Sequence, residues 1–231
     1  MVAYDRVVRP SRWSRRARLC AWVGVFAVLT TLGYSAGAVS SARAPRLDAL
    51  YDWRTAAFQL VAYGFLAVVG LLLSAGRSVR EVLALRRPRS WRRAALLILG
   101  VEVAWLSVSL GVAALVGVEG RELLPPRFHD DSRLLQFALN AAIAGLVAPA
   151  VEEALARGVG YALLEPSGAV VAVLWTGLAF ALAHGVVRDL PAILALGIGF
   201  SFLRARTGSL YPSLIVHVFT NSLALLASLA R

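Results

Sequence analysis

The sequence predicts an all-α, polytopic transmembrane helix bundle with about seven or eight membrane segments. Of its 231 residues, 59% are hydrophobic and only 16% are charged, and the mean hydropathy is +0.71, well above that of soluble domains. The apolar residues form long runs, most of which reach the roughly 18 to 20 residues that span a hydrocarbon core. The runs lie at 19–39, 55–75, 94–118, 134–163, 168–187, 190–203 and 210–230.

The first part of the chain combines a basic arm, residues 1–18, with transmembrane segments in residues 19–118. Arginines cluster in the arm and again in the loop at 76–93. Because basic loops stay on the cytoplasmic side of a membrane, both clusters predict a cytoplasmic N-terminus. The net charge of +11 is therefore explained by topology and by contact with the anionic headgroups of the lipid bilayer. Nucleic acid is not an expected partner.

The exclusive use of arginine and the apolar run at 19–39 indicate where the protein is located and how its N-terminus is anchored. All 24 basic residues are arginine, which is typical of a GC-rich coding sequence and favours a bacterial inner (plasma) membrane. The run at 19–39 follows a basic arm and precedes the small-residue stretch 40–44, so a cleaved signal peptide is an alternative to a membrane anchor. Its length and the six runs that follow favour an uncleaved anchor. The single cysteine, Cys20, excludes an intramolecular disulfide.

The second part, residues 130–231, is predicted to be a catalytic membrane domain because its apolar runs carry ionisable residues. The loop at 119–133, which contains two adjacent prolines, separates it from the first part. Ionisable side chains inside a spanning helix are costly, and each one is a functional hypothesis. The run at 190–203 is short, so it is compatible with a re-entrant or broken helix as well as with a spanning one.

Two adjacent acids, Glu152 and Glu153, lie in the run at 134–163. Adjacent side chains on a helix point about 100° apart, so these two carboxylates do not serve one site symmetrically. Glu153 and Arg157 are four residues apart with the acid first, which is the favourable order for an ion pair on one helix face. The spacing therefore predicts a structural pair of Glu153 with Arg157. It leaves Glu152 as the carboxylate for chemistry, suited to the role of a general base.

Two later runs carry histidines at helical spacing. Phe180 and His184 are four residues apart, and so are His217 and Asn221, so each pair shares a helix face. At a rise of 1.5 Å per residue, Glu152 and His184 lie roughly 21 and 27 Å from the turn between their helices, at a similar depth. A carboxylate, two imidazoles and an amide are the groups that peptide hydrolysis needs to activate water and to stabilise an oxyanion.

Three motifs carry a resemblance to a known family. They are Glu152-Glu153-Ala-Leu-Ala-Arg157, Phe180-Ala-Leu-Ala-His184 and His217-Val-Phe-Thr-Asn221. These resemble the EExxxR, FxxxH and HxxxN motifs of the CPBP (CAAX protease and bacteriocin-processing, ABI) family of glutamic-type intramembrane endopeptidases. The resemblance covers residues 130–231, with the motifs in the order of the family.

The resemblance implies catalytic roles for Glu152, His184, His217 and Asn221. It implies structural support of the site by Glu153, Arg157 and Phe180. Among the catalytic residues, the acid and the first histidine would activate the attacking water, and the second histidine and the amide would stabilise the oxyanion. No cofactor is expected. The alternative is a zinc site made by Glu152, His184 and His217, because two histidines and a glutamate form a legitimate catalytic ligand set.

The predicted function is therefore that of an intramembrane endopeptidase acting on a membrane-associated protein or peptide. The resemblance implies a C-terminal sorting tail, a prenyl-type substrate or a bacteriocin-like substrate, and the sequence does not choose among them. Two alternatives use the same residues differently. One is a non-proteolytic membrane immunity or scaffold protein of the same fold. The other is a small proton-coupled transporter, for which the sequence lacks a visible inverted repeat.

Overall fold

The structure is a computed structural model, and it describes residues 13–41, 48–117 and 128–229. Within these ranges the chain forms helices and no strand, which confirms the all-α prediction. The elements that correspond to the seven predicted runs are α1 (Arg15–Ser41), α2 (Trp53–Ser74), α4 (Trp91–Val116), a long helical stretch over Asp131–Ser167, α8 (Ala169–Ala183), α9 (Leu190–Thr207) and α10 (Tyr211–Leu229). Two short elements lie between them, η1 (Ala49–Tyr51) and α3 (Val79–Val82), and η3 (Asp131–Arg133) is the first turn of the long stretch.

Five of the described helices are long and apolar enough to cross a membrane, and α8 and α10 are shorter apolar helices. The predicted run at 190–203 forms a single helix of 18 residues, α9, so it is neither re-entrant nor broken. Many large apolar side chains point outward, for example Phe58, Val61 and Leu115, which are 73%, 73% and 87% exposed. A surface of this kind suits lipid rather than water. The protein is an integral membrane protein.

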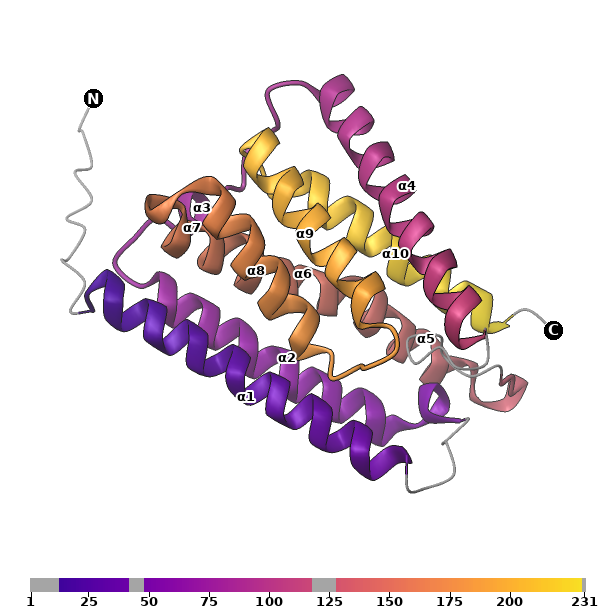
Figure 1. Ribbon diagram of the computed structural model, residues 1–231. Coiled ribbons are helices and arrows are strands. Elements are labelled where there is room, and N and C mark those ends of the chain that lie inside the picture. The colour runs from indigo at the N-terminus through magenta and orange to yellow at the C-terminus, as the bar shows by residue number, and fades with distance from the viewer. Residues whose placement is uncertain (1–12, 42–47, 118–127, 230–231) are drawn as a thin grey trace, which may run out of the picture.

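The helices form a bundle in which α1 and α2 lie as a pair along one side and α4 lies on the opposite side (Figure 1). Between them, α9 packs against both α8 and α4. The contact of α8 with α9 is close at Gly177 and Gly197, where an added Cβ on either glycine would meet the backbone of the other helix. Small residues allow such close approach between membrane helices. This glycine pair brings α9 next to the residues of the site.

The long helical stretch changes its winding twice, on either side of the two glutamates. It consists of α5 (Leu134–Ala142), the π-helical η4 (Ile143–Val147), α6 (Ala148–Glu153), the π-helical η5 (Ala154–Gly160), α7 (Tyr161–Leu164) and η6 (Glu165–Ser167). Proline at position 149 lacks an N–H and clashes with the carbonyl four residues earlier, so it disfavours regular α-winding there. π-helical turns are rare and frequently occur at functional sites. The glutamates thus lie on a short α-helical piece between two wider turns.

The N-terminal helix pair is packed directly onto this long stretch. The indole N–H of Trp22 on α1 donates to the Leu155 carbonyl at 2.9 Å, and its ring fills the space that a side chain at Gly160 would need. The Tyr34 hydroxyl donates to the Val186 carbonyl at 3.2 Å. The arm at 1–12 and most of the small-residue stretch 40–44 lie outside the described residues. The helix α1 itself is an integral part of the bundle.

Candidate active site

The first part of the site is a buried ion pair on the helix of the glutamates. Arg157 Nη1 donates to Glu153 Oε1 at 3.0 Å, and both side chains are fully buried. The spacing of these residues in the sequence predicts this contact. Arg157 also donates to the Ser201 hydroxyl at 3.2 Å and to the Gly197 carbonyl at 2.7 Å, both on α9. The guanidinium lies 4.2 Å from the Phe180 ring centroid, close enough for a cation–π contact. The pair therefore joins three helices.

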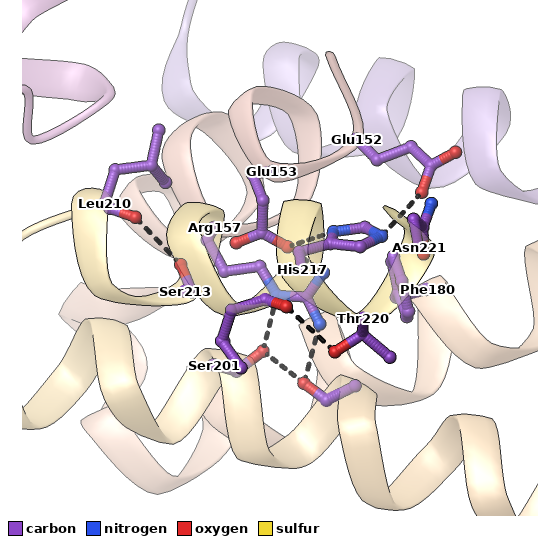
Figure 2. Close-up of polar contacts among 12 residues, drawn as sticks. Glu152, Glu153, Arg157, Phe180, Ser201, Leu210, Ser213, His217, Thr220 and Asn221 are labelled. Atoms are coloured by element: carbon purple, nitrogen blue, oxygen red, sulfur yellow. Dashed lines mark hydrogen bonds and ion pairs between the residues drawn. The ribbon is translucent and has the colours of Figure 1, made fainter. Parts of the chain in front are cut away.

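His217 on α10 lies between the two glutamates (Figure 2). Its Nδ1 is 3.2 Å from Glu153 Oε1, and its Nε2 is 3.7 Å from Glu152 Oε2. A carboxylate without a proton only accepts, so the contact with Glu153 fixes the hydrogen of the ring on Nδ1. The other nitrogen then faces Glu152 across a gap that is longer than a direct hydrogen bond. Glu153 therefore orients the histidine as well as pairing with arginine.

Glu152 has a further partner that the sequence does not reveal. The hydroxyl of Tyr63, on α2, donates to Glu152 Oε1 at 2.9 Å. The side chain of Glu152 is 22% exposed, whereas that of Glu153 is 0% exposed. The sequence leaves Glu152 without a partner, whereas in the structure Tyr63 and His217 flank its carboxylate. Tyr63 stands 89 residues earlier in the chain in a run without a motif, so no spacing could have pointed to it.

Phe180 and His184 form the second histidine position, at the end of α8. The helix ends at Ala183, four residues before the end of the predicted run, and His184 is its C-terminal cap. The His184 Nδ1 lies 2.8 Å from the Phe180 carbonyl. Since a carbonyl only accepts, Nδ1 carries the hydrogen and Nε2 keeps its lone pair. The Phe180 ring lies 4.6 Å from the His184 ring and 5.5 Å from the His217 ring, between centroids. It thus holds both imidazoles near one another.

Asn221 bonds to the π-helical turn that precedes the glutamates. Its Nδ2 donates to the Ala144 carbonyl at 3.0 Å. Within η4 the N–H of Ala148 bonds to Ile143, five residues back. In the same pattern the partner of Ala144 would be Pro149, which has no N–H. A carbonyl buried without a donor is costly, and the Asn221 amide supplies one. The second hydrogen of that amide group is not used by this contact.

The structure brings six of the seven predicted residues into one connected set through His217, Phe180 and Arg157. Asn221, the seventh, lies one helical turn beyond His217 on the same helix. No hydrogen bond or ion pair between Glu152 and His184 occurs among the described residues. The catalytic roles of these residues stay predictions.

The zinc alternative needs Glu152, His184 and His217 to converge on one point. Among the described residues, no group of three His, Cys, Asp or Glu side chains is placed to hold a metal ion. The three side chains therefore do not form the ligand set in this arrangement, and no step below is derived through a metal.

Comparison with known proteins gives a match to one family in the C-terminal part of the chain. Residues 134–223 match the family described as Type II CAAX prenyl endopeptidase Rce1-like. The matched segment begins at α5, ends within α10 and contains all seven predicted site residues. The helices α1, α2 and α4 lie outside it. No curated protein and no solved structure matches the chain significantly.

Proposed function

We propose that this chain, whose residues 134–223 match the Rce1-like family of CAAX prenyl endopeptidases, is an intramembrane endopeptidase that uses Glu152 to activate water. The observation that carries the proposal is the division of labour between two adjacent carboxylates. Arg157 neutralises Glu153 in a fully buried pair. Glu152 is partly exposed, lacks an arginine partner among the described residues and faces an imidazole nitrogen at 3.7 Å. Glu153 thus has a structural role, and the carboxylate of Glu152 is available to act as a base.

In the proposed reaction, Glu152 acts as the general base with His184 as its helper. The water oxygen bonds to the carbonyl carbon of the scissile peptide while its proton passes to Glu152. The resulting oxyanion is stabilised by His217 Nε2–H, in the protonated imidazole, and by the second amide hydrogen of Asn221. The C–N bond then breaks as the proton moves from Glu152 to the amine nitrogen. The products are a carboxylic acid and an amine.

Two features of the contacts support these roles. The carbonyl of Phe180 fixes Nδ1 of His184 as a donor, so its Nε2 has a lone pair that can accept a hydrogen bond from the attacking water while Glu152 takes the proton. The contact of His217 Nδ1 with Glu153 fixes the orientation of this ring, with Nε2 on the side of Glu152. A histidine held in this way can donate from Nε2 to a developing negative oxygen.

The substrate is a membrane-anchored protein or peptide, and the reaction takes place within the membrane-spanning part of the chain. Glu152 lies near the middle of the helical stretch Asp131–Ser167, which has 37 residues and is roughly 55 Å long at 1.5 Å per residue. The basic end of the bundle is proposed to face the cytoplasm of a bacterium, in the inner membrane. A sorting tail or a bacteriocin-like peptide fits this location better than a prenylated protein does.

The test compares membrane peptides from cells that produce the wild-type protein, Glu152→Gln or Glu165→Gln. Glu165 is exposed in η6, at the end of the same helical stretch, and serves as the matched control. We expect a truncated peptide in wild-type and Glu165→Gln cells, and a rate lower by about 10² to 10⁴ in Glu152→Gln cells at equal protein level.

Cleavage by Glu152→Gln at the wild-type rate would contradict the proposal. A protective effect in cells that survives Glu152→Gln intact would instead support a non-proteolytic immunity or scaffold protein. A proton-coupled transporter predicts flux that depends on pH in proteoliposomes, with no peptide cut.

A further inference from the structure

A cavity of about 290 Å³ lies away from the catalytic residues, where the start of α1, the end of α2 and the end of the long helical stretch meet. Its described lining consists of Trp13, Arg15, Arg18, Arg77, Ala162, Leu163 and Pro166. Three of these seven residues are arginines, and none is acidic. The polar side of the cavity is therefore strongly positive and its other side is apolar.

Two of the three arginines of the cavity, Arg15 and Arg18, are held in place by specific hydrogen bonds. Arg18 is only 3% exposed. Its guanidinium donates to the carbonyls of Leu73 at 2.7 Å and Ala75 at 2.6 Å, at the C-terminal end of α2. Arg15 Nη2 donates to the hydroxyl of Ser167 at 3.0 Å. Guanidinium groups fixed in this way are preorganised, so less side-chain entropy is lost when they bind an anion.

The position of the cavity indicates which kind of anion it suits. It lies at the ends of apolar helices, where the hydrocarbon core gives way to the headgroup region. Trp13 on its rim is 56% exposed, as expected for an aromatic side chain at the membrane interface. At this end of the bundle, the described stretches 13–18, 75–93, 162–168 and 204–211 hold twelve arginines and two acidic residues. The field at this end attracts anions.

We infer that this cavity binds the phosphate group of an anionic phospholipid, with the acyl chains on the apolar surface of the bundle. Arginine recognises phosphate oxygens through paired, charge-assisted hydrogen bonds, and basic pockets between membrane helices bind anionic headgroups. Because residues of α1, of the segment after α2 and of the end of the long helical stretch all line the cavity, a bound headgroup fastens the N-terminal helix pair to the long helical stretch. This inference is independent of the proposed protease activity.

The experiment uses the purified full-length protein in detergent and follows lipid binding by native mass spectrometry and thermal unfolding. Phosphatidylglycerol is the probe, and phosphatidylcholine is the neutral comparison. The test variant is Arg15→Gln with Arg77→Gln. The control is Arg16→Gln with Arg80→Gln, which removes the same charge at exposed residues of the same end that do not line the cavity. Arg18 is left intact because it is buried and bonded to α2.

We expect phosphatidylglycerol to bind the wild type and the control and to raise their unfolding temperature. The test variant should bind it at least tenfold more weakly, since the loss of even one charge-assisted bond is worth about that factor. Equal binding by all three proteins overturns the inference, and so does an equal loss in both variants, because either result excludes a specific site. Stabilisation by inorganic phosphate alone, with no further effect of the lipid, overturns the assignment to a phospholipid.

Discussion

The two neighbouring glutamates have the same side chain and opposite surroundings. Glu153 is enclosed completely and contacts the guanidinium of Arg157 and the imidazole of His217. Glu152 is 22% exposed, accepts a hydrogen bond from Tyr63 and lies 3.7 Å from the other nitrogen of the same imidazole. Adjacent positions on a helix point in different directions, so one residue meets the interior of the bundle and the other meets its accessible side. Complete enclosure beside a cation makes Glu153 structural, and partial exposure leaves the lone pairs of Glu152 available for chemistry.

The largest expected effect, on the free energy of unfolding, comes from removing the arginine that pairs with the enclosed Glu153. Arg157→Met leaves Glu153 buried without its cation, which should lower the free energy of unfolding by roughly 3 to 5 kcal/mol. The measurement is chemical or thermal unfolding in detergent, alongside the level of folded protein in membranes.

A double variant, Glu153→Gln with Arg157→Met, is the control for that result. It removes both charges, so it should recover a large part of the lost stability. A single Arg157→Met variant that is as stable as the wild type would contradict the structural role of the pair.

A smaller effect, on the rate of cleavage, is expected when the partly exposed Glu152 loses its hydrogen bond from Tyr63. Tyr63→Phe keeps the ring and removes the hydroxyl that donates to Glu152 Oε1, so the carboxylate loses its positioning bond. We expect kcat to fall about tenfold with KM unchanged, because a hydrogen bond to a charged group is worth at least that factor. The rates are measured on the peptide whose cleavage depends on Glu152.

The matched control is Thr31→Val, which removes an exposed hydroxyl that bonds only within its own helix. It should leave both kinetic constants as they are. If Tyr63→Phe instead raised KM alone, or lowered the unfolding temperature in step with kcat, then Tyr63 would not position the carboxylate.

The smallest expected effect concerns η4, the π-helical turn that precedes the two glutamates. Asn221→Ala leaves the Ala144 carbonyl without the donor that it has at 3.0 Å, which should cost about 1 kcal/mol of unfolding free energy. Pro149→Ala restores a backbone N–H at position 149, so in that background the cost of Asn221→Ala should shrink. The double-mutant cycle measures this coupling. Strict additivity of the two changes would argue against the bond as a support of the turn.

Much of the fold could be predicted from the chain itself. The long apolar runs predict α1, α2, α4 and the helices after them, because only a helix satisfies its own backbone within a bilayer. The i, i+4 spacing predicts the contact of Glu153 with Arg157, since both atoms needed for it belong to one helix. The run at 190–203 was ambiguous because its apolar part is shorter than α9, whose last turn carries Arg204 and Arg206.

The amino-acid sequence by itself determined the membrane-embedded helices, the three motifs and the ion pair within one helix turn, because these depend on composition and local spacing. The tertiary structure alone decided that Tyr63 contacts Glu152, that His217 lies between the two glutamates and that Asn221 meets the Ala144 carbonyl. These contacts join helices that are 64 to 89 residues apart in sequence. The physical reason is that local spacing fixes the direction of a side chain on its own helix, while the packing of small residues between helices fixes what it meets.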